Sequence, residues 1–175
     1  MQVRKDYAEV ITRKFPEAVV IAIAKDAQGK YNPITLGWTM ITSYEPPMMA
    51  MAVALTHYSR EVIEAAGEFV VAFPSSTMAE AALFYGTHSG RDIDKLKEHP
   101  IATEAASQVD VLLLSDAVAN FECKLESKMV VGDHMLFVGR VVASHMNTDT
   151  TLKRLYTLAP DYRMGAVSAD VSCQS

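Results

Sequence analysis

The amino-acid sequence predicts a mainly β fold of the α+β class, in which hairpin-linked antiparallel strands close into a barrel. Residues 18–24 form a short apolar run rich in β-branched side chains, and a turn signal follows at residues 25–30. Residues 121–128 alternate apolar or small side chains with charged ones, which is the two-residue period of a strand. Closure into a barrel is favoured because it removes exposed strand edges.

The first half of the chain continues this pattern. We expect one strand over residues 34–43, antiparallel to the strand at 18–24. Glu45, Pro46 and Pro47 should end it, because a proline nitrogen has no hydrogen to donate to a ladder. Residues 48–55 should form the next strand.

Three helices are expected in the middle of the chain. Ser59 is a candidate N-cap of the first helix, and Gly67 is a candidate stop. A strand over residues 68–73 follows, then an alanine-rich helix that starts with a capping-box pattern at 77–80 and ends near Gly86. A short helix is expected over residues 92–98.

The last third of the sequence predicts a strand over residues 121–128, a turn at 132–133 and a returning strand over 135–145. The alternation places Cys123 on the inner face, with an inert thiol. The charged residues of the same strand should face water, and these are Glu122, Lys124, Glu126 and Lys128.

Length and composition narrow the class of protein. The 175 residues fit a single domain over 1–175, and 50% hydrophobic with 21% charged residues is typical of a globular chain. A net charge of −5 argues against nucleic-acid binding. Two cysteines, Cys123 and Cys173, cannot build a disulfide framework. The N-terminus lacks the apolar core of a signal peptide, and the most apolar stretch, 46–55, is too short to span a bilayer, so we expect a cytoplasmic protein without membrane contact.

Two kinds of catalytic site are disfavoured. The five histidines form no His-x-His or His-Glu-x-x-His pair, and the cysteines lie far apart, so a zinc site is not expected. The sequence His88-Ser89-Gly90 is not the Gly-x-Ser-x-Gly elbow of a hydrolase. The absence of Gly-x-Gly-x-x-Gly after a strand also disfavours a Rossmann domain.

Three groups of residues are candidates for ligand binding. Polar and amphipathic residues along one predicted hairpin would suit a planar ligand, although a core tryptophan with ordinary strand threonines explains them equally well. They are Asn32, Thr35, Trp38, Thr39 and Ser43.

The second group, Ser59 and Arg60, opens a helix whose free amides would suit a phosphate, although a plain N-cap with a solvated arginine has the same pattern. In the third group, Arg91 and Lys95 are four residues apart and share one helix face, where they either pair with Asp92 and Asp94 or supply positive charge to a ligand. His134, at a turn, either has a structural role or donates a hydrogen bond to an anion.

Several stretches of the sequence resemble, in order, the flavin reductase-like, FMN-binding split-barrel family, and most closely its flavoredoxin branch. The most specific are residues 31–40, with Asn32, Trp38, Thr39 and Met40, and Ser89-Gly90-Arg91-Asp92-Ile93-Asp94-Lys95. Weaker matches lie at residues 43–47, 57–59, 68–75, 121–123 and 132–139.

The resemblance implies a six-stranded antiparallel split barrel with flanking short helices, a homodimer, and one FMN per subunit. It also implies roles for individual residues. The strand bordering the flavin ring would carry Asn32, Thr35, Trp38, Thr39 and Met40. Phosphate ligands would be Ser59 and Arg60, while Arg91, Lys95 and His134 would be further cofactor contacts. The C-terminal segment with Tyr156, Tyr162 and Gly165 matches the family only loosely.

These observations lead to a functional hypothesis: an FMN-dependent oxidoreductase that moves hydride or electrons between NADH, NADPH or a protein partner and the flavin, with no catalytic side chain of its own. A non-catalytic flavin-binding electron carrier needs the same pocket and stays open. A split barrel that holds haem or a deazaflavin also stays open.

Overall fold

The computed structural model describes residues 1–168 and is mainly β, as the sequence predicts. The principal sheet contains β2 (Val20–Lys25), β3 (Tyr31–Leu36), β4 (Thr39–Tyr44), β5 (Pro47–Ala54), β6 (Glu68–Phe73), β9 (Ala119–Val131) and β10 (His134–Met146). Short strands form two further small sheets, β1 (Glu17–Ala18) with β11 (Tyr156–Thr157) and β12 (Met164–Gly165), and β7 (Thr103–Ala105) with β8 (Leu112–Leu114).

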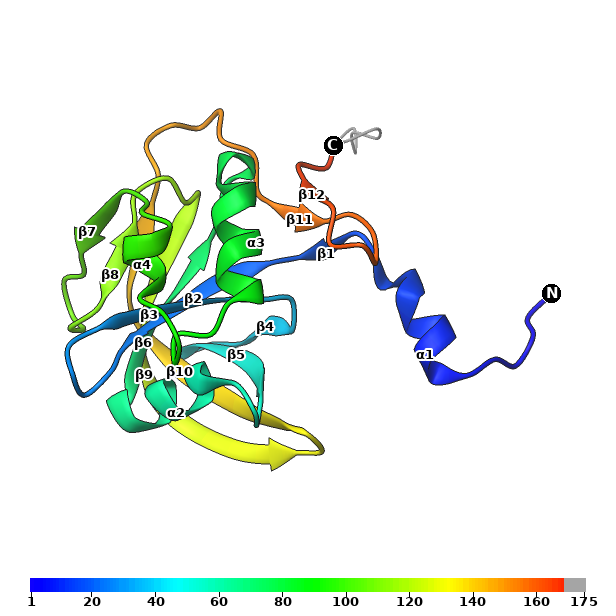
Figure 1. Ribbon diagram of the computed structural model, residues 1–175, viewed down its shortest axis with the longest axis horizontal. Coiled ribbons are helices and arrows are strands. Elements are labelled where there is room, and N and C mark those ends of the chain that lie inside the picture. Colours follow the sequence, from blue (N-terminus) through cyan, green and yellow to red (C-terminus); the bar gives the residue numbers. More distant parts are fainter. Residues whose placement is uncertain (169–175) are drawn as a thin grey trace.

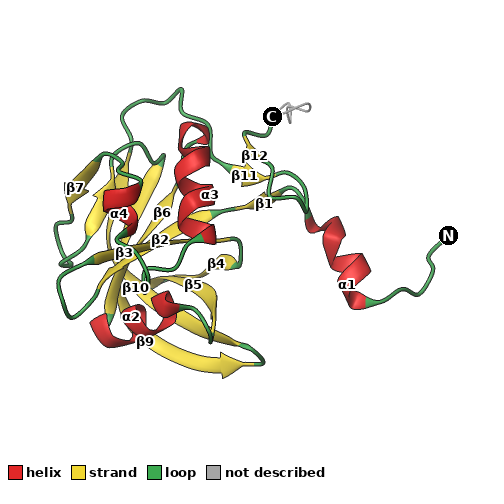
Figure 2. Cartoon of the chain, viewed as in Figure 1, coloured by secondary structure: helices red, strands yellow, loops and turns green. Residues whose placement is uncertain are grey.

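Helical segments lie between and before these strands (Figure 2). They are α1 (Tyr7–Val10), α2 (Tyr58–Ala66), α3 (Ala79–Thr87) and α4 (Lys95–Glu98), with 3-10 turns η1 (Ile11–Lys14) and η2 (Ser76–Met78).

The principal sheet is antiparallel throughout, in the order β3-β2-β6-β9-β10-β5-β4. Although β3 and β4 are consecutive in the chain, they lie at the two opposite edges of this sheet, with Gly37 and Trp38 between them. The curled sheet is therefore an open, split barrel, and the link between its two edges runs along the split.

The prediction of one strand over residues 34–43 is wrong, because this stretch contains parts of two strands, β3 and β4. The principal sheet accordingly has seven strands, where the family resemblance implies six. The chain leaves one edge of the sheet at Leu36 and begins the other edge at Thr39. The apolar and polar pattern continues across Gly37, so the sequence alone gives no sign of this change of edge.

Two hydrophobic cores lie on the two faces of β2, whose residues Val20 to Ala24 are all buried. One core lies inside the barrel and includes Val62 and Ile63 of α2. The other lies outside and includes Tyr85 of α3. Burial on both faces explains why this strand reads as a continuous apolar run without alternation.

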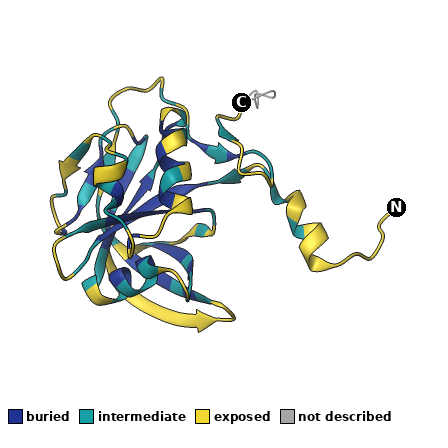
Figure 3. Cartoon of the chain, in the orientation of Figure 1, coloured by how far each residue is buried: buried dark blue, intermediate teal, exposed yellow. Residues whose placement is uncertain are grey.

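The N-terminal and C-terminal parts of the chain meet on one side of the barrel. There, β1 pairs with β11, and β11 pairs with β12 (Figure 1). Beyond this small sheet the N-terminal segment with α1 projects from the body, and its residues 1–10 are exposed (Figure 3).

The prediction that Glu122 faces water is wrong, because its side chain is completely buried. Its neighbours Lys124, Glu126 and Lys128 are exposed, as expected. The segment at residues 107–109 covers this part of β9 and donates three backbone hydrogen bonds to the Glu122 carboxylate. The alternation of residues 121–128 predicts which side chains share a face, but it does not show that the loop at residues 107–109 covers Glu122. Cys123 is buried as predicted, and burial beside Glu122 raises the pKa of its thiol to about 12.

Helix starts differ from the expectations by a few residues. Helix α2 begins at Tyr58, so His57 is its N-cap and Ser59 lies in its first turn, while Gly67 ends it in the left-handed conformation as predicted. The short helix over 92–98 begins only at Lys95. Cys173 lies outside the described residues. Within residues 1–168, no helix combines the length and hydrophobicity that crossing a membrane requires.

Candidate cofactor site

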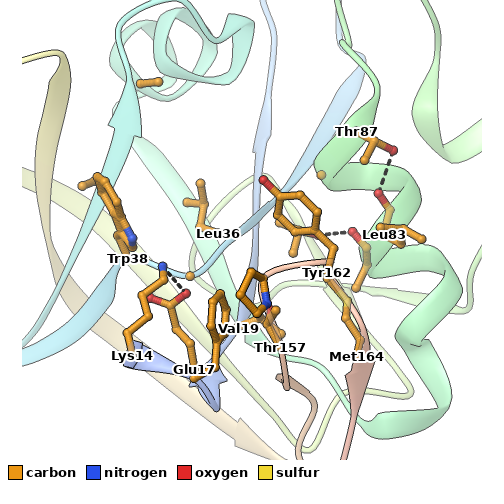
Figure 4. A pocket seen from close by; sticks show the side chains of 18 of the residues that line it. Lys14, Glu17, Val19, Leu36, Trp38, Leu83, Thr87, Thr157, Tyr162 and Met164 are labelled. Carbon is orange, nitrogen blue, oxygen red and sulfur yellow. Dashed lines mark hydrogen bonds and ion pairs between the residues drawn. The ribbon is translucent and has the colours of Figure 1, made fainter. Parts of the chain in front are cut away.

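A cleft of about 540 Å³ lies at the split of the barrel (Figure 4). Its walls come from the chain segment 35–38 between the sheet edges, from α3, from the N-terminal segment 11–19 and from the C-terminal segment 157–164. Most of its lining side chains are aliphatic or aromatic. Its volume falls within the roughly 300–1,000 Å³ typical of small-molecule sites.

Trp38 forms an aromatic wall of this cleft. This residue, the only tryptophan of the chain, is 47% exposed despite its large apolar ring. Its ring centroid lies 4.6 Å from that of His134. The Lys14 ammonium lies 5.6 Å from the indole centroid and pairs with Glu17 at 2.6 Å. The Glu17 carboxylate in turn fills the space beside Gly37, where a Cβ would lie 2.7 Å from its Oε2. The cleft therefore has a flat, partly exposed indole with a cation nearby.

Two histidines, His57 and His134, line the cleft, and His134 is the one that lies against Trp38. His134 begins β10, and its Nδ1 lies 2.6 Å from Oδ1 of Asp133, an interaction that lowers the pKa of the Asp133 carboxyl. Partial desolvation of the ring at the cleft wall, together with the proximity of His134 and Lys95, lowers the pKa of His57 below its usual 6.5, although the residue keeps exposed surface. His57 is therefore mostly neutral at pH 7.

A smaller cavity of about 200 Å³ adjoins the cleft, and His57, Gly86 and Thr87 line both. Its remaining lining is more polar and includes Ser59 and Lys95. The two cavities together offer an apolar, aromatic chamber with a polar end.

Lys95 is the cation of the smaller cavity. Only 3% of the residue is exposed, and its Nζ donates to the carbonyls of Pro33 and Tyr85, each at 2.8 Å. The first carbonyl lies on the edge strand β3 and the second in the last turn of α3. Burial, with a smaller effect of Lys30, lowers the pKa of Lys95 to about 8. An ammonium has three N–H donors, so one remains for a ligand.

The N-terminus of α2 supplies further donors to this cavity. Within the described chain, no side chain caps this helix, so the backbone amides of Tyr58 and Ser59 are open to a ligand, whereas the amide of Arg60 donates to the carbonyl of His57 at 3.0 Å. Ser59 lies in the first turn, is 3% exposed, and its Oγ accepts a 2.7 Å hydrogen bond from Nδ2 of Asn32. A buried cation, a hydroxyl and a helix N-terminus together favour an anionic group.

The structure brings five of the ten predicted site residues into the walls of these cavities. Thr35, Trp38 and His134 line the cleft, whereas Ser59 and Lys95 line the smaller cavity. The hydroxyl of Thr35 is already engaged, since it donates to the carbonyl of Ala82 at 2.6 Å.

The other five predicted residues lie outside both linings, as far as the described part of the chain goes. They are Asn32, Thr39, Met40, Arg60 and Arg91. Asn32 lies behind Ser59, and Thr39 donates to the carbonyl of Ala50.

Carboxylates hold the two arginines, of which Arg91 is exposed and Arg60 is partly buried. Arg60 pairs with Glu61 and Glu64, and Arg91 lies 2.8 Å from Glu61. Met40 is 58% exposed on the edge strand β4. These positions lie close in sequence to the cavity residues, but their side chains point elsewhere.

Sequence reasoning missed the N-terminal wall of the cleft and matched the C-terminal wall to the family only loosely. The N-terminal segment contributes Lys14 and Phe15, and the C-terminal segment contributes Tyr162 and Met164. Neither segment carries a motif of its own. The pairing of β1 with β11 brings them to the cleft, and a local sequence pattern does not predict this pairing. His57 lies on the family match at residues 57–59, but it was not among the predicted site residues, although it belongs to both cavities.

The flavin reductase like domain matches residues 12–163 of this sequence. The match covers most of the chain and includes all residues that line the two cavities except Ile11 and Met164. The chain therefore belongs to the flavin reductase-like domain family, a family of flavin-binding oxidoreductases.

Relatives of known sequence are similar over part of their length. An uncharacterized protein of Archaeoglobus fulgidus is 30% identical over 113 residues, which are 65% of this chain and 64% of that protein. An NADH-dependent FMN reductase of Streptomyces nodosus is 30% identical over 112 residues, which are 64% of this chain and 60% of that protein. The chain thus matches less than two thirds of the length of either relative.

Solved structures share the fold at lower sequence identity. Flavoredoxin from Methanosarcina acetivorans superposes with a TM-score of 0.86 at 22% identity, covering 99% of this chain and 95% of the other. An FMN-binding protein from Thermus thermophilus with bound p-hydroxybenzaldehyde gives a TM-score of 0.87 at 20% identity, covering 99% and 100%. These similarities establish the flavin reductase-like split-barrel fold.

Proposed function

We propose that this chain binds FMN, with the flavin ring in the 540 Å³ cleft and the phosphate in the 200 Å³ cavity, and that it acts as a flavin-dependent oxidoreductase. The observation that carries this proposal is the shared lining of the two cavities. An apolar chamber with Trp38 in its wall adjoins a polar end with Ser59 and Lys95, which is the order of ring and phosphate in FMN.

The chemistry of the donors supports a phosphate. With a net charge of −5, the protein must gather positive charge locally to hold an anion. Lys95 and the uncapped N-terminus of α2 provide it, and the Lys95 ammonium is buried away from bulk water, where electrostatic attraction is stronger. A single small cavity of this kind favours the one phosphate of FMN over the larger diphosphate of FAD.

When bound, a flavin supplies two-electron redox chemistry and exchanges hydride with a reduced nicotinamide. The side chains around the cleft would then orient the ring, exclude water and set the local charge. Lys14, His57 and His134 are among the lining groups able to donate a hydrogen bond or positive charge toward the ring. No nucleophilic side chain is required.

Reduced nicotinamide is proposed as the electron donor because a relative in this family is an NADH-dependent FMN reductase. The test is to add FMN or FAD to the purified protein, remove free flavin and record the visible spectrum. NADH or NADPH is then added without oxygen. Bleaching of bound FMN supports the reductase, whereas tightly bound FMN that neither coenzyme reduces favours a non-catalytic electron carrier with a protein partner.

We also propose a homodimer. Exposed apolar side chains gather on edge strand β4 and at the tip of β9, namely Met40, Ile41, Tyr44, Met129, Val130 and Val131. Burial of such side chains against a second copy would remove apolar surface from water. Light scattering should give about twice the 19.2 kDa of one chain, and a mass of one chain would contradict the dimer.

A further inference from the structure

Asn32 is a buried polar residue that lies outside both cavities. Its backbone is fixed in β3, where it pairs with Ala24 of β2, and only 2% of the residue is exposed. Its Nδ2 donates to Oγ of Ser59 at 2.7 Å. Each unpaired buried polar atom lowers the stability of the fold, so a buried asparagine is expected to have a structural or functional role.

The other end of the Asn32 amide lies against Gly90. A Cβ at position 90 would lie only 1.9 Å from Oδ1 of Asn32, so glycine is required there. Oδ1 has no hydrogen-bond partner among residues 1–168. Asn32 is therefore enclosed by β3, α2 and the loop at residues 89–94, and its single side-chain hydrogen bond goes to Ser59.

This hydrogen bond determines what the Ser59 hydroxyl can do. A hydroxyl has one hydrogen to donate and accepts through its oxygen. Because the oxygen of Ser59 accepts from Asn32, its hydrogen is free to point into the smaller cavity, which Ser59 lines. The reverse orientation of the Asn32 amide would take up this hydrogen and withdraw it from the cavity.

We propose that Asn32 is a positioning residue that holds the Ser59 hydroxyl as a donor to a phosphate in the smaller cavity, and so favours phosphorylated over unphosphorylated flavin. This inference rests on the proposed function. It assigns to Asn32 an indirect action on the phosphate, through Ser59, in place of a direct contact with the flavin ring.

The test compares the dissociation constants of FMN and riboflavin, which differ only by the phosphate. Titrations that follow the quenching of Trp38 fluorescence give both constants for the wild type, Asn32→Ala, Ser59→Ala and the double variant. A hydrogen bond to a charged group corresponds to about a tenfold to hundredfold loss, so both single variants should weaken FMN binding by about tenfold or more. Riboflavin binding should change less than about twofold in each.

The double variant tests whether Asn32 acts through Ser59. If it does, the double variant binds FMN about as weakly as Ser59→Ala alone. Asn120→Ala is the matched control, since Asn120 is also a buried asparagine but bonds to Leu114 at a distance from the cavity residues. It should lower the melting temperature without changing the ratio of the FMN and riboflavin constants.

Two results would overturn the inference while leaving the proposed function intact: equal losses for FMN and riboflavin in Asn32→Ala, or additive losses in the double variant. Wild-type protein that binds neither flavin would instead overturn the proposed function, and this inference with it. If Asn32→Ala does not fold, Ser59→Ala and Asn32→Asp carry the test. The aspartate accepts the Ser59 hydrogen but also adds a negative charge, so Asn32→Asp is made both in the wild type and in Ser59→Ala. It must weaken FMN binding more in the wild type, and an equal loss in both would overturn the inference.

Discussion

Nε2 of His145 lies 2.6 Å from Oε1 of Glu122, a carboxylate with no solvent-exposed surface. The same carboxylate accepts hydrogen bonds from the backbone amides of Ser107, Gln108 and Val109. Glu122 thus attaches the segment at residues 107–109 to β9, on the outer face of the barrel. This interaction stabilises the fold away from the two cavities.

Replacement of Glu122 by glutamine should destabilise the protein strongly. The amide nitrogen of glutamine would face backbone N–H groups that need an acceptor, and it would remove the charge that pairs with His145. We expect the free energy of unfolding, measured in urea, to fall by about 3 kcal/mol. Glu126→Gln, at an exposed position of the same strand, should change it by less than about 0.5 kcal/mol. Equal effects would contradict the role of Glu122.

The pH dependence of stability should reflect the same group. Burial alone would raise the pKa of Glu122, but the hydrogen bonds from Ser107, Gln108 and His145 outweigh it and lower the pKa to about 2. Since the folded-state pKa lies below the usual 4.5, this stabilisation is complete above pH 4.5 and is lost as the pH falls toward 2. Urea unfolding at pH 6 and pH 3 should show this loss in the wild type and a smaller one in Glu122→Gln.

FMN affinity should depend on Lys95 and decrease in alkaline solution. Lys95→Met removes the buried ammonium of the smaller cavity, so we expect FMN binding to weaken by about tenfold to hundredfold. Because burial lowers the pKa of Lys95 to about 8, the free protein loses this charge above pH 8, and FMN affinity should fall with it. Fluorescence titration between pH 7 and pH 9 measures both effects.

Arg60→Met is the matched control for Lys95→Met, since Arg60 is held by Glu61 and Glu64 outside the cavities. It should weaken FMN binding less than Lys95→Met does. A larger effect of Arg60→Met would mean that Arg60, as the family resemblance implies, contacts the phosphate directly.

The backbone conformation of Tyr162 should lower the free energy of unfolding of the protein. Its φ of 59° lies in the left-handed region, which costs a tyrosine about 1 kcal/mol or more. Asparagine tolerates this conformation, so Tyr162→Asn should raise the free energy of unfolding by about 0.5–1 kcal/mol. It also removes an aromatic wall of the cleft, so the dissociation constant of FMN should rise. Tyr162→Phe keeps the ring and should leave both quantities unchanged; a destabilised Tyr162→Asn would contradict the strain.

The strands could be predicted where the sequence carries a local period. The runs that became β2, β5, β6, β9 and β10 were recognised within a few residues. The break at Gly37 was missed because the change from one sheet edge to the other depends on the whole barrel. Glu122 was misplaced because the loop that covers it lies outside the strand, 13 to 15 residues earlier in the chain, and leaves no sign in the strand pattern.

The candidate site could be predicted only where motif and geometry coincide. Trp38, Ser59 and Lys95 lie on the motifs and also in the cavity walls. Arg60 lies on the same motif as Ser59, but successive residues of a helix point in different directions, and its side chain pairs with carboxylates instead. Lys14 and Tyr162 enter the cleft only through tertiary pairing of the chain ends.

The most direct test of the central claim is the visible spectrum of the purified protein after incubation with excess FMN and removal of the free flavin. We expect flavin absorbance that remains with the protein at about one FMN per chain, together with quenched fluorescence of Trp38. Protein that stays colourless, with unchanged tryptophan fluorescence, would contradict the assignment of the two cavities to the ring and phosphate of FMN.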